Sequence, residues 1–125
     1  MRESILLALA LSISTAAMAA PPGTAQNFLE RANRLKGKGP FAFFDADYKR
    51  LKAEATAVGQ SIRADRIAAE KAGRPILYCS PKPRAQLGDF EFIDGLEAIP
   101  FAERERMSLK QAMIRVLQKK YPCRT

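Results

Sequence analysis

The chain has 125 residues, a length suited to one small domain, and its formal net charge at pH 7 is +8. It contains no histidine and only two cysteines, which excludes histidine-based acid–base catalysis and leaves a tetrahedral zinc site incomplete. We therefore predict a protein that is not an enzyme and that holds no metal and no cofactor.

The start of the chain has the layout of a secretory signal peptide. A short polar beginning precedes an apolar stretch at residues 5–13, and "AMA" at residues 17–19 matches an A-x-A cleavage signal. The apolar stretch is shorter than the roughly 20 residues that cross a bilayer, which argues against a membrane anchor. We predict a signal peptide over residues 1–19, one helical domain over residues 20–125, and no membrane span.

Two helices are predicted in the first half of that domain. The first covers residues 25–36, with Thr24 in the N-cap position and a Gly/Pro cluster at its end. The second covers residues 46–72 and begins after Asp45, a good cap residue. Its apolar residues are spaced 3, 4, 3 and 4 apart: Tyr48, Leu51, Ala55, Val58 and Ile62. We expect Ile67 and Ala68 to continue this stripe, with a shift near Gly59.

A connector and a third helix are expected next. "RPILYCS" at residues 74–80 has the apolar run of a short strand. One strand would lack a partner, so we predict an extended connector. Pro81 and Pro83 are expected to introduce the third helix, which ends before Pro100. One face of this helix is predicted to be buried: Leu87, Phe90, Ile93 and Leu96.

The fourth helix has the clearest start signal. Ser108 and Gln111 match a capping box, and Pro122 ends the helix. Its predicted buried stripe consists of Leu109, Ala112, Met113, Val116 and Leu117. The fold class that follows is all-α, a small bundle of about four helices with one disulfide.

That disulfide is predicted between Cys79 and Cys123. Two cysteines in an exported chain most simply form one bridge, with a free thiol pair or a metal site as the alternatives. Closing this stretch of chain should stabilise the fold by about 4 kcal/mol. Cys79 precedes the third helix and Cys123 follows the fourth, so antiparallel packing of these helices would place both cysteines at the same end.

Two groups of residues near the second helix are candidates for function. Asp45 and Asp47 form a close carboxylate pair, but an aspartate near a helix start usually caps it, so we predict no catalytic site there. Phe41, Phe43 and Phe44 are either core residues or exposed anchors for a protein partner. Three phenylalanines within four residues cannot easily all face inward, so we expect at least one at the surface.

Charge is segregated in the second half of the chain. Residues 89–97 contain four acids and no base, whereas residues 110–124 contain five bases and no acid. If the last two helices are neighbours, these acids and bases form ion pairs along the edges of the helix contact, and each exposed pair stabilises the fold by about 0–1 kcal/mol. The basic balance of the chain fits plain solubility, an anionic surface or an acidic partner that it would steer, and for an exported protein nucleic acid is the weaker choice.

Residues 76–123 carry a pattern of short motifs. "YCSP" precedes a helix patterned with Leu, Phe and Ile, "AIP" follows, and "SLKQAMIRVLQKKYPC" closes the pattern. This resembles the exported immunity proteins of the Tai type, which protect bacteria against cell-wall amidase toxins delivered by type VI secretion. The residues that match are Cys79, Pro81, Pro100, Tyr121, Pro122 and Cys123.

The resemblance implies a helical, disulfide-bonded protein of the periplasm that inhibits a peptidoglycan hydrolase by covering its active site. The matched residues belong to the scaffold, and the further cysteines that many relatives carry in the first half are missing here. The candidate partner-binding residues are therefore Phe41, Phe43 and Phe44. A small periplasmic stress chaperone, or a domain that keeps only the scaffold, is the alternative, and a homodimer stays open.

Overall fold

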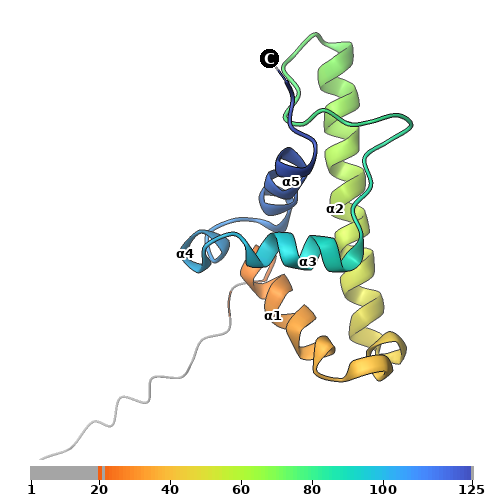
Figure 1. Ribbon diagram of the computed structural model, residues 1–125, viewed down its shortest axis with the longest axis vertical. Helices are drawn as coiled ribbons and strands as arrows, with labels where there is room; N and C mark the ends of the chain where they lie inside the picture. Colours follow the sequence, from red (N-terminus) through yellow and green to blue (C-terminus); the bar gives the residue numbers. More distant parts are fainter. Residues whose placement is uncertain (1–19, 21, 125) are drawn as a thin grey trace, which may run out of the picture.

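The computed structural model describes residues 20 and 22–124, and this part of the chain is all-α (Figure 1). Its elements are α1 (Ala25–Lys36), the 3-10 helix η1 (Gly39–Phe44), α2 (Ala46–Lys71), α3 (Asp89–Glu97), α4 (Phe101–Arg104) and α5 (Leu109–Lys120). The all-α prediction is confirmed, with η1 and α4 added to the four expected helices. The predicted signal peptide lies outside the described residues. Within them, no helix combines the length and the apolar character needed to cross a bilayer.

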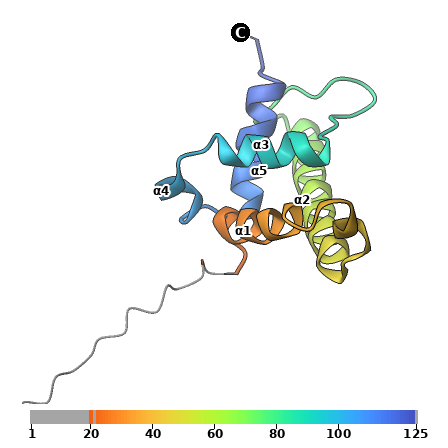
Figure 2. The ribbon, with the colours of Figure 1, turned by 60° about the horizontal axis from the view of Figure 1, so that its bottom comes forward.

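The long helix α2 organises the arrangement of the other elements. α1, η1 and α5 pack against α2, and α3 packs on α1 and α5. Figures 1 and 2 show that α3 lies across α5 rather than alongside it. The core lies between α1, α2, α3 and α5, and its largest fully buried side chain is Leu96.

Three helices begin where the sequence predicts, because side chains satisfy their first backbone amides. The Thr24 hydroxyl accepts a hydrogen bond from the Asn27 amide at 3.2 Å. The Asp45 carboxylate accepts one from the amide two residues later at 2.8 Å. Ser108 and Gln111 form the reciprocal capping box at 3.0 and 2.9 Å. These bonds replace intrahelical partners that the first turn of a helix lacks.

The stripe of α2 stays in the core only as far as Ile62. Leu51 and Ile62 are buried, and the other predicted positions pack against the core. Ile67 is 40 % exposed and Ala68 is exposed too, so the expectation that they continue the stripe is wrong. From Ile62, a step of five residues turns the side chain by roughly 140° around the helix, which carries Ile67 away from the buried face of α2.

The third helix does not begin at Pro81 or Pro83. α3 begins at Asp89, and the residue before it, Gly88, is extended and donates its amide to the Glu91 carboxylate at 3.2 Å. Each proline disfavours helical backbone in the residue before it, and the chain stays irregular up to Gly88. The predicted start of this helix is therefore wrong. Residues 72–88, which we call the connector, separate α2 from α3.

The later start also changes which face of α3 is buried. Ile93 and Leu96 are buried as predicted, but Phe90 is 67 % exposed. Its place in the core is taken by Phe92, whose ring lies 5.5 Å from that of Phe28 on α1. The predicted burial of Phe90 is therefore wrong.

Cys79 and Cys123 form the predicted disulfide, with their Cα atoms 4.9 Å apart. Because Cys79 lies in the connector and α3 crosses α5, the bridge does not join matching ends of two antiparallel helices. Beside it, the Cys79 amide donates to the Tyr121 carbonyl at 2.9 Å. The Tyr121 hydroxyl donates to the Gln86 carbonyl at 3.1 Å and accepts from the Gln86 amide at 3.3 Å. Together these bonds fasten the connector to the C-terminal end of α5.

A polar contact joins α1, α3 and α4. Gln26 is the one polar side chain in the described buried core, and it accepts a hydrogen bond from Arg104 Nε at 2.8 Å. Another nitrogen of the same guanidinium donates to the carbonyls of Leu96, Glu97 and Ile99. The end of a helix leaves such carbonyls without intrahelical partners, so Arg104 closes α3 and ties it to α1.

α3 approaches α5 most closely at Gly95. A Cβ atom at this position would lie 2.7 Å from Val116 Cγ1 and 2.8 Å from Val116 Cγ2. Real Cβ atoms essentially never make such short contacts. Because Gly95 has no side chain, α3 and α5 can cross this closely.

Removing the bridge should destabilise the protein strongly. We expect Cys79→Ala to lose about 4 kcal/mol, because the unfolded chain gains the freedom of the opened loop. For a domain of this size, that corresponds to a melting temperature lower by well over 10 °C. Thermal unfolding followed by circular dichroism measures this. The double variant with Cys123→Ala should lose no more, and two free thiols in protein purified without reductant would contradict the bridge.

Gly95→Ala should destabilise the protein by about 1–3 kcal/mol, because the new methyl group collides with Val116. This loss should outweigh the roughly 1 kcal/mol gain in helix propensity. Gly59→Ala in α2 is the matched control, since its Cβ would lie 3.9 Å from Met113 Sδ, an ordinary contact. The control should be stabilised by about 0.4–1 kcal/mol in urea unfolding. Equal stabilisation of both variants would rule out the close crossing.

Candidate functional site

The three candidate phenylalanines all lie on η1 with exposed side chains. Phe41 is 77 % exposed and Phe44 is 87 % exposed, and Phe43 is also more than half exposed. Within η1 only Ala42 packs against the core. The expectation of at least one surface ring is confirmed, and core packing of this cluster is excluded. We refer to Phe41, Phe43 and Phe44 as the aromatic cluster.

An apolar groove of about 400 Å³ lies beside the aromatic cluster. Its walls come from α1, η1, α2 and α3. Phe43 and Tyr48 line it, with their rings 5.3 Å apart in an edge-on arrangement. Phe90 also lines the groove, so the ring that was expected in the core contributes to this surface instead.

One hydrogen-bonded group links α2 to α3 at the edge of the groove. Asp89 accepts from Lys52 Nζ at 2.9 and 3.0 Å and from the Tyr48 hydroxyl at 3.3 Å. The hydrogen bond to Asp89 raises the pKa of Lys52. The charges at this edge therefore neutralise each other, and the groove keeps its apolar character.

The aspartate pair has structural roles. Asp45 caps α2 and also accepts a hydrogen bond from Lys38, and this bond, followed by the one from the Asp47 amide, lowers the pKa of Asp45. Asp47 pairs with Arg50 at 2.9 Å. The prediction that Asp45 is a cap is confirmed. Within the described residues, no group of three or more His, Cys, Asp or Glu side chains is arranged to hold a metal ion.

The acids of α3 do not pair with α5 alone. Glu91 pairs with Lys120 of α5 at 2.6 Å, and this hydrogen bond lowers the pKa of Glu91. Asp89 pairs with α2 and Glu97 with α1. The expected compensation between the last two long helices is therefore only partly right, because α3 crosses its neighbours and meets three of them.

Comparisons of the chain with family models, curated proteins and solved structures gave no match. The resemblance of residues 76–123 to Tai-type immunity proteins thus rests on the short motifs quoted above. The function has to be argued from the surfaces of the molecule.

Phe41→Ser and Phe44→Ser should leave the free energy of unfolding within about 0.5 kcal/mol of the unaltered protein, because both rings are exposed. Phe92→Ala is the matched control, since the same kind of ring is buried there. It should lose about 3–5 kcal/mol. Urea unfolding compares the three. A loss above about 1 kcal/mol in either serine variant would mean that the aromatic cluster belongs to the core.

Proposed function

We propose that this protein is exported to the periplasm, where it binds a peptidoglycan hydrolase and inhibits it by covering the active site. The observation that carries the proposal is the exposure of Phe41, Phe43 and Phe44 beside an apolar groove. Exposed apolar patches of this kind mark interaction sites. The motifs at residues 76–123 suggest the class of partner, a cell-wall amidase.

The aromatic cluster is suited to inhibition because the backbone that carries it is held in place before binding. η1 is fixed at its end by the Asp45 amide, which donates to the Ala42 carbonyl at 3.0 Å, and by the bond between Lys38 and Asp45. Phenylalanine rings supply large contact areas, and anchors held in their bound position lose little entropy on association. Binding energy is therefore expected to concentrate in these rings.

The charges around the aromatic cluster should govern the rate of association more than the affinity. Lys49 and Arg50 are exposed on α2 just after the cluster. Exposed charges at the edge of an interface mainly steer the encounter and make it sensitive to salt. Their removal should slow association while changing dissociation little.

The exposed rings also favour a second function, that of a stress chaperone. A chaperone holds unfolded clients through exposed apolar surface and would use the same rings with little selectivity. The two functions differ in what the protein captures: one hydrolase in stoichiometric amounts, or many unfolded proteins. A domain that keeps only the scaffold would capture neither.

The test is capture from periplasmic extract with the exported protein, followed by assay of the captured hydrolase on purified peptidoglycan. We expect inhibition at a one-to-one ratio. Phe41→Ala or Phe44→Ala should weaken it by roughly 30-fold, the equivalent of about 2 kcal/mol for an anchor residue.

The matched control for these variants is Phe101→Ala. Phe101 is also exposed but lies on α4, away from the aromatic cluster (Figure 1). It should inhibit as the unaltered protein does. An equal loss in the control would remove the aromatic cluster from the interface. Capture of many heat-unfolded proteins without a hydrolase would instead support the chaperone.

A further inference from the structure

Two segments without acidic residues meet at the disulfide. Residues 71–88 contain four bases and no acid, and residues 106–125 contain six bases and no acid. The bridge between Cys79 and Cys123 and the backbone bond from Cys79 to Tyr121 join the two segments. The two segments therefore bring bases, and no acids of their own, to the end of the molecule where α2 ends (Figure 1).

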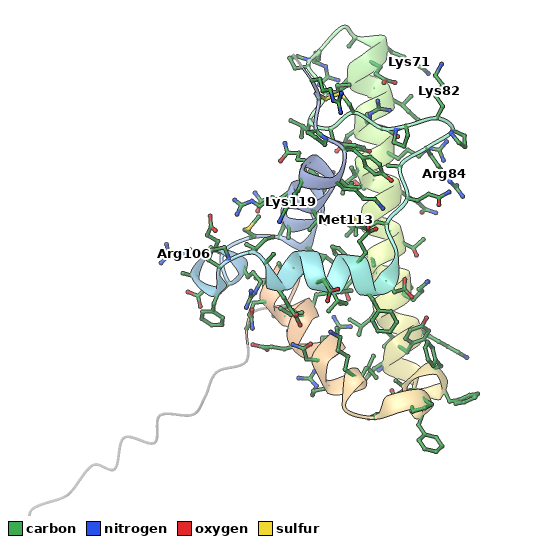
Figure 3. All side chains as sticks on the ribbon, viewed as in Figure 1. Lys71, Lys82, Arg84, Arg106, Met113 and Lys119 are labelled. Atoms are coloured by element: carbon green, nitrogen blue, oxygen red, sulfur yellow. A yellow bond between two sulfur atoms is a disulfide. The ribbon has the colours of Figure 1, made fainter. Side chains whose placement is uncertain are left out.

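Both acids of the last turns of α2 are already engaged. Asp65 pairs with Lys110 at 2.6 Å, and Glu70 pairs with Arg66 at 3.0 Å. Within the part of the chain that the structure describes, seven exposed bases near this end form no ion pair. One of them, Lys119, lies on α5 on the side away from the connector (Figure 3). We call the other six the basic end: Arg63, Lys71, Arg74, Lys82, Arg84 and Arg124. Their charges are available to an anionic partner.

Aliphatic side chains are exposed among these bases. Arg63, Ile67 and Lys71 follow one another at intervals of four residues, so they share one face of α2. In the connector Leu77 is 58 % exposed, and with Arg74 it borders a hollow of about 330 Å³ between the connector and α2. The surface thus combines cations with apolar groups.

The labelled bases of this region point in a common direction. Figure 3 shows Lys71, Lys82 and Arg84 on the same side of the molecule, where the connector passes α2, whereas Arg106 lies on the opposite side. The aromatic cluster is at the other end of α2, about 40 Å away along this 26-residue helix. The basic end can therefore be occupied while the aromatic cluster stays accessible.

We propose that the basic end binds the surface of a bilayer that contains anionic phospholipids. Its bases would pair with lipid phosphates, and Leu77 and Ile67 would enter the boundary between headgroups and acyl chains. Each base near such a surface strengthens binding by roughly fivefold. A nucleic acid or another polyanion would use the same bases but gain nothing from Leu77, so this side chain distinguishes the lipid surface.

The experiment measures co-sedimentation of the exported, disulfide-bonded protein with vesicles. Vesicles of phosphatidylcholine alone are compared with vesicles in which about a third of the lipid is phosphatidylglycerol, at low and at high salt. We expect binding to the anionic vesicles and a loss of more than tenfold at high salt, where the charges are screened. Absence of binding to the anionic vesicles would overturn the proposal.

Two charge variants with the same net charge locate the site. Lys82→Gln combined with Arg84→Gln should weaken binding to anionic vesicles by roughly 30-fold. Arg34→Gln combined with Arg106→Gln removes two exposed bases elsewhere and should weaken it less than about threefold. Since all four side chains are exposed, both variants should fold. Equal losses would show attraction by net charge alone and overturn the proposed site.

The apolar contribution is tested separately with Leu77→Ser. This variant should bind anionic vesicles roughly fivefold more weakly and bind heparin, a polyanion without acyl chains, as the unaltered protein does. Unchanged binding to vesicles would mean that the basic end recognises polyanions or acidic proteins in general, and would overturn the lipid surface as its partner. Because the aromatic cluster takes no part in these measurements, their outcome is independent of hydrolase inhibition.

Discussion

The attachment of the connector to the C-terminal end of α5 is the constraint on which the rest of the structure depends. The chain between α2 and α3 has no helix of its own, and without an anchor its many conformations would leave α3 poorly placed. The bridge from Cys79 to Cys123, together with the Tyr121 bonds to Cys79 and Gln86, restricts that freedom. α3 then begins where it can cross α5 at Gly95 and form one wall of the apolar groove.

The same attachment explains how one small chain presents two dissimilar surfaces. α2 is long enough to keep the two surfaces at its ends apart. Its buried residues, Leu51 and Ile62, pack in the core formed with the other helices (Figure 1). At its start, ion pairs such as the one between Lys52 and Asp89 neutralise the rim, so that apolar groups dominate. At the end of α2, the anchored connector contributes three bases and no acid, so several bases there have no acidic partner. The first surface suits shape recognition, and the second suits long-range attraction.

The parts of the fold that local chemistry determines could be predicted from the sequence. The starts of α1, α2 and α5 depend on caps a few residues away, and their buried faces on helical spacing. The start of α3 depends on how the connector is held by α5, which is distant in the sequence. Because of that dependence, the sequence did not indicate that Phe92 rather than Phe90 is buried in the core. It therefore also did not indicate that Phe90 lines the groove. The role of Gly95 in the close crossing could not be predicted either. A glycine in a helix indicates only lower helix stability until the packed neighbour, here Val116, is known.

The aromatic cluster also explains why a crosslink matters at the opposite end of the molecule. Each ring that stays exposed forgoes the roughly 1.5–3 kcal/mol that burial of a large apolar side chain provides. For a domain with a net stability of about 5–15 kcal/mol, three such rings are a large fraction of the total. The bridge offsets part of that loss, about 4 kcal/mol, without occupying the aromatic cluster itself. Stabilising the domain by burying Phe41 or Phe44 would remove the surface itself, so a covalent constraint remote from η1 reconciles exposure with folding.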